Sequence, residues 1–464
     1  MKNTLFFTLL AAASCMPGYA KQVATDKPNV LFILVDDLGY SDVSYMNYKS
    51  GIHTPNIDKL ADTGVIFTNA YAACPVCSPT RASILTGKYP ATLKLTCHIP
   101  GMGMEKYLNK LKKGKPLQEA YFRDHLPTGE ITIAEELAEA GYDTGFFGKW
   151  HLAGEGSIHT KDGIVNADYH PDKQGFDINI GGNAYGQPKS YFSPYKSGTL
   201  NDGPDGEYLT DRLTTEAIDF MKSHNDDPFF CYLSYYTVHT PYRAPKGLVD
   251  DNDGNVYHAM INCLDNNVGR LVDYLTKNNL LENTLIVFYA DNGGLQANPP
   301  LRARKGSLYE GGIRVPLFFS WKGHIKAGKQ NSTPVTSVDM FPTLLDIANV
   351  NTDVKGIEGK SLAPVLLQGE ALDERPLFWH FPHHRSEDGA MGAAVRKGEW
   401  KLIYEFEKDR YQLFNLNKDV SETTDLLSKY PKKAKELRKD LERWQKKIDA
   451  EMPLPNPDFQ VNNK

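Results

Sequence analysis

Two apolar segments that each end in a pair of polar oxygen-bearing side chains constrain the fold of this chain most. The first spans residues 29–35 and runs into Asp36-Asp37, and the second spans residues 285–289 and precedes Asp291-Asn292. A run that is apolar on both faces is typical of a central strand in a parallel sheet. Because the carboxyl ends of parallel strands meet at one edge of the sheet, we expect the two polar pairs to share that edge.

The rest of the chain fits an α/β fold. Residues 229–234 form a third candidate for a buried strand, and amphipathic helices are predicted around residues 135–140 and 213–221. Strands that alternate with helices predict a large, mostly parallel sheet flanked by helices. A length of 464 residues leaves room for a smaller second domain.

The pattern of the sequence changes near Pro376. Short alternating pieces predict a small antiparallel sheet over residues 392–395, 400–405 and 411–415. A charged amphipathic helix is predicted to follow over residues 432–450. We therefore predict a large domain over residues 21–375 and a smaller α+β domain over residues 376–464.

The N-terminus has the pattern of a secretory signal. Lys2 precedes an apolar run from Leu5 to Ala13, and small residues favour cleavage after Ala20. The run is too short to span a bilayer, and no later segment is long and apolar enough to do so. Removal of residues 1–20 would leave a secreted or periplasmic protein with no membrane span. Lipid attachment at Cys15 is the poorer alternative, because the usual leucine before such a cysteine is missing.

Charge and cysteine content narrow the functional classes. The formal net charge is −5 and no segment is densely basic, which argues against nucleic acid as a partner. Without Cys15, five of the six cysteines remain, an odd number for an oxidising compartment. Either one cysteine serves a purpose other than pairing, or several are buried thiols.

The polar pairs at the strand ends are candidate metal ligands. Adjacent carboxylates are costly unless positive charge neutralises them, although a single Asp-Asp pair is also common in a solvated turn. Asp36, Asp37, Asp291 and Asn292 together offer four oxygen donors and no histidine. This donor set favours calcium or magnesium over zinc.

Residues 77–81, Cys-Ser-Pro-Thr-Arg, combine a thiol, a proline and an arginine. The proline suits the first turn of a helix, which would put Cys77 at a helix N-terminus, where free N–H groups attract anions. Arg81 lies one turn further on and could direct its guanidinium to the same place. The segment therefore predicts a nucleophile held in an anion-binding site.

Basic side chains follow other predicted strand ends. Lys149 and His151 come directly after the apolar Phe146-Phe147, and His239 follows the predicted strand at residues 229–234. Lys305 lies in a basic loop that contains several glycines. Each of these residues alone has an ordinary explanation, such as a structural histidine or a solvated lysine, so none of them identifies a function by itself.

The order of these motifs resembles that of the type I sulfatases of the alkaline phosphatase superfamily, over nearly the whole mature length. The matching segments are residues 28–37, 77–87, 148–151, 238–241, 291–293, 305–312, 359–362 and 396–402. The resemblance implies an alkaline phosphatase-like fold, with a large mixed, mostly parallel sheet and a smaller C-terminal α+β domain. One departure is Lys88, where the family has arginine after Thr-Gly.

The resemblance also implies a modification and a cofactor. A maturase would oxidise Cys77 to formylglycine (3-oxoalanine), whose hydrated form attacks sulfur and gives a covalent sulfo-enzyme. One calcium ion per chain would be held by Asp36, Asp37, Asp291, Asn292 and the modified Cys77.

Five further residues would line the sulfate pocket by the same resemblance: Arg81, Lys149, His151, His239 and Lys305. Lys149 and Lys305 are expected to hold the sulfate oxygens, and Arg81 the formylglycine hydroxyls. His239 is the expected general acid for the leaving alkoxide. His151 is expected to take the proton whose loss expels sulfate and restores the aldehyde.

A secreted enzyme of this kind is expected to act on sulfated carbohydrate, as an exo-acting O-sulfatase on glycosaminoglycan, mucin or algal glycans. Polar residues in two loop regions are the predicted sugar contacts: His98, His380, His383, His384 and Arg385.

Three other functions are compatible with part of the sequence. Formylglycine-dependent phosphonate or phosphodiester hydrolases share the C-x-P-x-R pattern of residues 77–81. Cys74 and Cys77 form a C-x-x-C that could be a redox dithiol or half of a zinc site. The chain has no second C-x-x-C, and a dithiol has no use for the strand-end carboxylates. A carbohydrate-binding protein without catalysis is disfavoured, because every expected polar group is present.

Overall fold

The computed structural model describes residues 27–459 apart from internal gaps at 48–50, 102–103, 155–166, 225–226, 386–388 and 390. The predicted signal peptide and the lipidation alternative at Cys15 lie outside the described residues. In the part of the chain that is described, no helix has the length and apolar character needed to cross a membrane.

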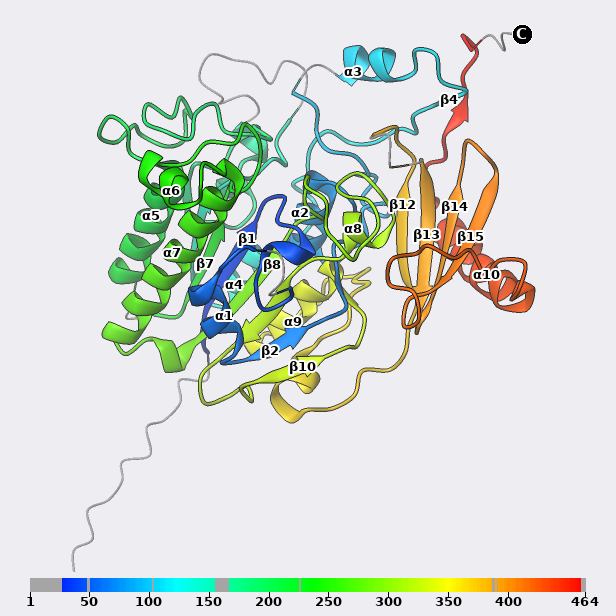
Figure 1. Cartoon of the computed structure of the whole chain (residues 1–464). Coiled ribbons are helices and arrows are strands. Elements are labelled where there is room, and N and C mark those ends of the chain that lie inside the picture. Colours follow the sequence, from blue (N-terminus) through cyan, green and yellow to red (C-terminus); the bar gives the residue numbers. More distant parts are fainter. Residues whose placement is uncertain are drawn as a thin grey trace, which may run out of the picture.

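A mixed eight-stranded sheet forms the centre of the large domain (Figure 1). Its strand order is β10-β2-β9-β8-β1-β7-β5-β6. These strands are β1 Asn29–Val35, β2 Val65–Phe67, β5 Asp143–Gly148, β6 Ile178–Ile180, β7 Phe229–Ser234, β8 Thr284–Ala290, β9 Leu317–Ser320 and β10 Lys329–Asn331. β9 runs antiparallel to both neighbours and every other pairing is parallel, so the predicted mixed, mostly parallel sheet is confirmed.

The three predicted strands β1, β7 and β8 lie side by side in the middle of this sheet, and every one of their residues is buried. Val35 pairs with Ala290 at the end of the β1–β8 ladder. Because the two strands end level with each other, Asp36 and Asp291 leave the sheet at the same edge.

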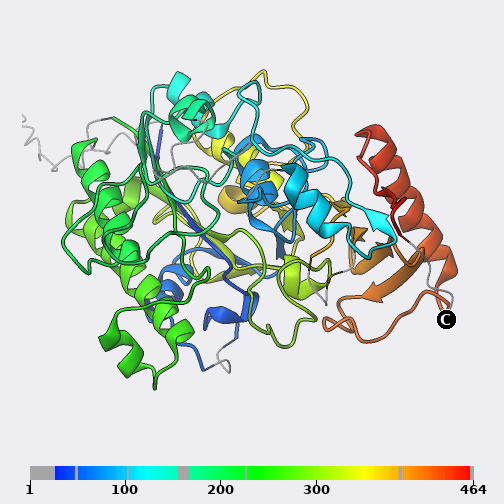
Figure 2. The same cartoon turned by 90° about the horizontal axis from the view of Figure 1, so that it is seen from above.

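Helices cover both faces of the large sheet (Figures 1 and 2). One layer contains α1 Pro55–Ala61, α5 Leu209–Ser223, α6 Lys246–Asp251 and α7 Val256–Lys277, and the other contains α2 Cys77–Thr86, α4 Ile133–Glu139 and α9 Met340–Ile347. The predicted helix at 213–221 is the central part of α5, and the one at 135–140 starts at the third residue of α4 and ends one residue beyond it. α4 begins earlier than predicted because Thr132 and Glu135 exchange hydrogen bonds as a capping box at its N-terminus.

A four-stranded antiparallel sheet follows in the C-terminal part, with α10 (Pro431–Lys447) packed against it (Figure 1). Its strands are β12 Leu377–Phe381, β13 Gly392–Lys397, β14 Trp400–Glu405 and β15 Arg410–Asn415. The sequence predicted the last three strands and the helix, and missed β12. The domain boundary at residue 375 stays a prediction.

Short elements connect the two parts at the carboxyl edge of the large sheet. β4 Leu117–Gln118 of the large part pairs with β16 Leu454–Pro455 of the C-terminal part, whereas β3 Ala70–Tyr71 pairs with β11 Val335–Thr336 within the large part. The small helices α3 Met104–Leu111 and α8 Glu310–Ile313 also belong to this region. Trp379 of β12 donates its indole N–H to the carbonyl of Ala72 at 2.8 Å. The small sheet is thereby fixed beside the segment that leads into α2.

Candidate active site

The four predicted oxygen ligands meet at the carboxyl ends of β1 and β8, and all four side chains are buried. The backbone N–H of Asp37 donates to Asp291 Oδ1 at 3.2 Å, and Asn292 Nδ2 donates to Asp37 Oδ1 at 2.8 Å. Asp36 completes the cluster directly after β1. Two strands that are distant in sequence therefore bring these oxygen atoms together, as their common position at strand ends predicts.

Cys77 lies beside these carboxylates. α2 begins at Cys77, as the sequence predicts, and every residue of this helix is buried. Ligand atoms of Asp36, Cys77 and Asp291 all lie within 4.8 Å of one another. Lys305 Nζ lies 3.5 Å from Cys77 Sγ. The thiol is therefore surrounded by both signs of charge.

Arg81 anchors α2 to the carboxylates. Its Nε donates to Asp291 Oδ2 at 2.9 Å, and its Nη2 lies 2.7 Å from the same oxygen. Its Nη1 donates to the carbonyl of Lys149 at 2.8 Å and to Ser234 Oγ at 2.6 Å. Ser234, the last residue of β7, is a supporting residue that the sequence analysis missed, because no motif surrounds it.

Two buried lysines complete the charge balance. Lys149 Nζ donates to Asp36 Oδ2 at 2.6 Å, and Lys305 Nζ donates to Asp37 Oδ1. Both ammonium groups are almost completely shielded from solvent. Buried charges of this kind are tolerated only when they are paired, so three cations and three carboxylates stabilise one another here.

The crowded charges shift the pKa values of the carboxyls in opposite directions. Burial raises the pKa of Asp291 to about 6; the charges of Asp36 and Asp37 add to the rise, and Arg81 opposes it. Burial also favours a higher pKa for Asp37, but the charges of Lys305, His239 and Lys149 outweigh this effect and hold the pKa of that carboxyl well below its usual range.

The donor set fits calcium. Three buried oxygens in the cluster, Asp36 Oδ1, Asp37 Oδ2 and Asn292 Oδ1, accept no hydrogen bond from the described residues. Buried polar atoms without a partner are costly, and a bound cation is one way to satisfy them. Three carboxylates and one amide oxygen, with no histidine, are the ligands that calcium prefers.

Two histidines complete the predicted set. His151 Nε2 lies 2.9 Å from the carbonyl of Ile99, so Nε2 carries the hydrogen and donates it. His151 Nδ1 then has a free lone pair, and no described residue bonds to it. Burial and the charge of Lys149 hold the pKa of His151 well below its usual value, which leaves a neutral ring that can accept a proton.

His239 lies on the other side, with Nε2 3.8 Å from Asp37 Oδ2 and Nδ1 2.6 Å from the carbonyl of Thr240. Burial lowers the pKa of His239 to about 3; Lys149 and Lys305 add to this effect, and Asp37 opposes it. Its Nε2 is the nitrogen left available, because Nδ1 is committed to the backbone.

A cavity of about 550 Å³ opens over these groups. We call it the Cys77 cavity. Its polar lining includes Cys77, His98, His151, Tyr185, Gln187, Lys189, His239, Lys305 and Arg385. Of the five predicted sugar contacts, the structure therefore places His98 and Arg385 in the lining. Gln187 and Lys189 were missed, since neither belongs to a recognisable motif.

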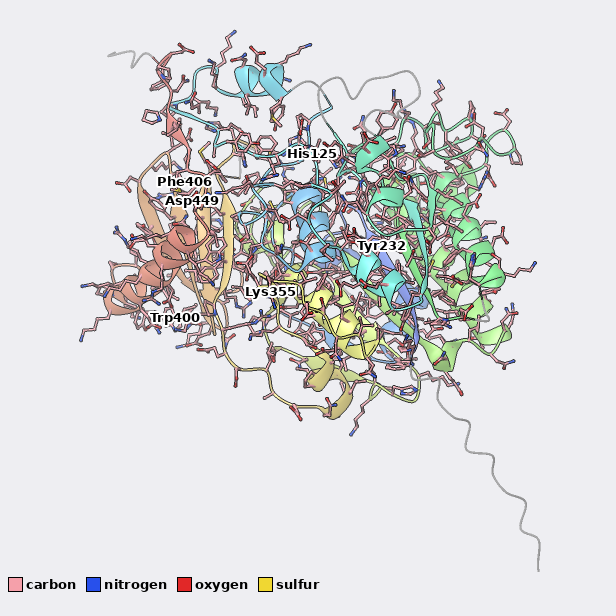
Figure 3. The ribbon with its side chains drawn as sticks, turned by 180° about the vertical axis from the view of Figure 1, so that it is seen from behind. His125, Tyr232, Lys355, Trp400, Phe406 and Asp449 are labelled. Carbon is pink, nitrogen blue, oxygen red and sulfur yellow. The ribbon has the colours of Figure 1, made fainter. Side chains whose placement is uncertain are left out.

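The other three predicted sugar contacts are not among the residues that line the Cys77 cavity. His380 is buried in β12, where Nε2 donates to the Glu451 carbonyl at 2.8 Å and Nδ1 accepts from Gln445 Nε2 at 3.1 Å. Its ring packs at 5.6 Å from Phe406, which Figure 3 labels in the C-terminal part, away from Tyr232 in the large sheet. Both ring nitrogens are used, so His380 serves the packing of the small sheet.

His383 and His384 are also occupied elsewhere. His383 Nδ1 bonds to Glu119 Oε2 at 2.7 Å and Nε2 to Thr96 Oγ1 at 2.8 Å. The backbone N–H of His384 donates to Glu119 Oε1 at 2.7 Å, and its Nε2 bonds to the carbonyl of Leu117 at 2.9 Å. These bonds fix the course of the chain just before Arg385.

The C-x-x-C alternative finds no support in the geometry. Cys74 and Cys77 are both free thiols, as are Cys97, Cys231 and Cys263. Cys74 Sγ donates to the carbonyl of Thr96 at 3.5 Å. Burial raises the pKa of the Cys74 thiol well above its usual value, which disfavours the thiolate that redox chemistry or zinc binding needs.

Comparisons with known proteins agree with this site. A family model described as Sulfatase matches residues 28–350, and one described as N-sulphoglucosamine sulphohydrolase, C-terminal, matches residues 304–449. A protein named Sulfatase from Formosa agariphila is 31% identical over 92% of this chain and 89% of its own length. Human N-acetylgalactosamine-6-sulfatase is 28% identical over 78% of this chain and 70% of its own length.

Solved structures agree as well. The crystal structure of Ps i-CgsB is 32% identical, with a TM-score of 0.75, and the match covers 90% of this chain and 92% of that one. Ps i-CgsB has also been solved in complex with k-i-k-neocarrahexaose. Because the Sulfatase model matches well over half of the chain, this protein belongs to the type I sulfatase family and is a sulfuric ester hydrolase.

Proposed function

We propose that this enzyme is an exo-acting carbohydrate O-sulfatase that uses a formylglycine made from Cys77 and one calcium ion. The observation that carries the proposal is the position of Cys77, in the lining of the Cys77 cavity and against a buried cluster of carboxylates and cations. The names of the relatives support a carbohydrate substrate. One is a human N-acetylgalactosamine-6-sulfatase, and Ps i-CgsB is solved with k-i-k-neocarrahexaose.

Asp36, Asp37, Asp291 and Asn292 would hold the calcium together with the oxidised Cys77. When present, calcium supplies fixed positive charge and formylglycine supplies a hydrated aldehyde as the oxygen nucleophile for sulfur. The role of the protein side chains is to hold these groups in place. Arg81 holds the carboxylate of Asp291 in position, because its guanidinium bonds both to Asp291 and to Ser234 at the end of β7.

Lys149 and Lys305 would bind the sulfate oxygens. Both ammonium groups lie at the carboxylate cluster, and Lys305 also lines the cavity. Fixed charges in a buried site stabilise the charge that develops on the transferred group, and they need no reorganisation during the reaction.

Two histidines would move protons. His239 donates a proton from Nε2 to the leaving sugar oxygen, and His151 accepts one at Nδ1 when sulfate is expelled. The low pKa of His239 leaves its ring neutral in the free site. A sulfate ester next to Lys149 and Lys305 would offset their charges, raise the pKa of His239 and so favour the protonated ring that the acid role needs.

His98 and Arg385 would contact the sugar. Arg385 Nη1 lies 3.3 Å from His98 Nε2 and donates to it. Burial and the nearby Arg385 hold the pKa of His98 well below its usual value, so the histidine stays neutral. His383 would act as a positioning residue, since Glu119 binds its ring and also accepts from the backbone N–H of His384 just before Arg385.

We propose two further features, a maturation step and export from the cell. A formylglycine-generating maturase must act on residues 77–81 before the enzyme can turn over. Export after cleavage behind Ala20 would bring the enzyme to extracellular glycans, with lipid attachment at Cys15 as the alternative.

The decisive experiment combines mass spectrometry with a substrate panel. The peptide that contains Cys77 should carry the aldehyde, and the same preparation should release sulfate from at least one member of a set of position-defined sulfated monosaccharides. Phosphate diesters and phosphonate monoesters are assayed in parallel. Higher kcat/KM on those compounds than on every sulfate ester would contradict the proposal in favour of the phosphorus-ester alternative.

A further inference from the structure

A second, larger hollow of about 850 Å³ adjoins the Cys77 cavity. We call it the basic groove. One wall is formed by Leu111 at the end of α3 and the turn after it, and the other by β14, β15 and the turn between them. The two hollows share Arg385, which lines both of them. Figure 1 shows α3 near the small sheet, above the carboxyl edge of the large one.

The groove is strongly positive although the whole chain is acidic. Seven of its fifteen lining residues are Lys or Arg and two are Glu, whereas the formal net charge of the chain is −5. Such a concentration of one charge in a concave surface attracts oppositely charged ligands.

Three of these positive charges are free. Lys110, Lys113 and Lys115 are exposed, and within the described ranges none of them forms an ion pair. Their neighbour Lys112 differs, because its Nζ pairs with Asp458 at 3.0 Å. On the opposite wall, Arg410 pairs with Glu405 at 2.8 Å. The positive charge that is not paired with a carboxylate therefore lies mainly on the α3 side of the groove and at Arg385.

The Cys77 cavity continues this pattern. Lys189, Lys305 and Arg385 are among its lining residues, which include no Asp or Glu. A sugar that carries one sulfate needs positive charge only at the reacting group. Positive charge that extends along a second hollow fits a ligand with several anionic groups.

We propose that the basic groove binds the continuation of a polyanionic glycan whose terminal sulfated sugar occupies the Cys77 cavity. The substrate is then an oligosaccharide with further sulfate or carboxylate groups. These groups bind to Lys110, Lys113, Lys115 and Arg385. This inference rests on the proposed function. A nucleic acid would match the charge alone, but the groove shares the lining residue Arg385 with the catalytic cavity, which favours an occupant that continues from the substrate.

The test measures binding without turnover, with Cys77→Ala protein and isothermal titration calorimetry. Three probes are compared: a sulfated galactan hexasaccharide, the same hexasaccharide after desulfation, and galactose 6-sulfate. The variant replaces Lys110, Lys113 and Lys115 with Ala, and the matched control replaces Lys106, Lys222 and Lys326, which are exposed lysines outside the groove.

The sulfated hexasaccharide should bind more tightly than the other two probes, and its affinity should fall as salt is raised. The groove variant should weaken hexasaccharide binding by about tenfold and leave galactose 6-sulfate unchanged, since three exposed charges each contribute modestly. The control variant should bind all probes as the parent does.

Equal hexasaccharide affinity in the groove and control variants would overturn the inference. So would displacement of the hexasaccharide by an equal concentration of a single-stranded oligonucleotide of the same charge, because the groove would then be an unselective polyanion surface. Failure of the unmutated enzyme to release sulfate from any ester would refute the proposed function instead, and the binding data would show which of the two had failed.

Discussion

Lys401 Nζ lies 2.8 Å from Glu310 Oε1 and joins the small sheet to the segment that carries Lys305. Lys401 belongs to β14, and Glu310 begins α8 five positions after Lys305. Glu422 completes the cluster, with Oε1 2.9 Å from Lys401 Nζ, and all three side chains are fully buried. The C-terminal part thus anchors a lysine of the active site, although it contributes none of the proposed catalytic residues.

Lys401→Met should destabilise the protein by about 3–5 kcal/mol, because it removes the cation that lies between Glu310 and Glu422 and leaves Glu310 with the more distant Arg314 at 3.5 Å. The measurement is urea unfolding followed by circular dichroism. Lys397→Met on β13 is the matched control. Lys397 pairs with Glu436 and Asp440 at the surface, so its loss should cost less than about 1 kcal/mol. Equal losses in the two variants would show that the buried cluster adds no stability.

The same cluster should make stability fall as pH rises towards neutrality. Burial raises the pKa of Glu422 from 4.5 to about 7; Glu310 adds to the rise, and Lys401 opposes it. Between these two values the folded protein keeps a proton that the unfolded chain has lost. The contribution of Glu422 to the free energy of unfolding should therefore decrease from pH 4.5 to pH 7, whereas the buried histidines with lowered pKa values contribute in the opposite direction.

Glu422→Gln removes this titration, so the free energy of unfolding of the variant should rise relative to that of the parent between pH 4.5 and pH 7. Unfolding is measured at a series of pH values with saturating calcium, so that Asp291 contributes equally to both proteins. Identical slopes in the parent and the variant would contradict the assignment to Glu422.

The central strands and the metal-binding edge are predictable from sequence, because a strand buried on both faces is a continuous apolar run. β1, β7 and β8 give this signal, and Asp36 and Asp291 follow directly from where two of them end. β12 gives a weaker signal, since His380 interrupts its apolar residues. The N-terminal turn of α4 is visible only through the capping box of Thr132 and Glu135.

The sugar side of the site is much less predictable. His383, His384 and Arg385 are adjacent in sequence, but only Arg385 lines the Cys77 cavity. The difference depends on Glu119, which lies 264 positions before His383 and binds its ring. Contacts at this sequence separation leave no local pattern, so the composition of a loop cannot show which of its residues face the substrate.

Calcium should stabilise the folded enzyme as well as activate it. A ligand that binds only the folded state adds about 2.7 kcal/mol at a concentration of 100 Kd, so the Tm should rise with added calcium. Asp291→Asn should reduce this rise, and Asp346→Asn at an exposed position of α9 should leave it unchanged. An enzyme that keeps full activity after chelation would contradict the metal assignment.

Cys77→Ala should lower kcat by at least about 10³-fold, because no other group in the cavity can form the formylglycine. The fold and the calcium-dependent rise in Tm should persist, since four of the five proposed ligands remain. Cys74→Ala is the matched control, as Cys74 is equally buried and its thiol donates to the carbonyl of Thr96. Appreciable activity in the Cys77 variant would contradict the assignment of Cys77 as the source of the nucleophile.

His239→Gln should lower kcat/KM more for substrates whose leaving group needs a proton than for substrates whose leaving group is a stable anion. A sugar alkoxide leaves poorly without one, so kcat/KM for a sulfated sugar should fall by about 10²–10⁴-fold. Nitrophenolate leaves as a stable anion, so 4-nitrophenyl sulfate should lose less than about tenfold. His53→Gln, at an exposed position away from the cavity, should change neither value. Equal losses on the two substrates would mean that His239 only positions the sulfate, and His151 would then be the next candidate for the acid.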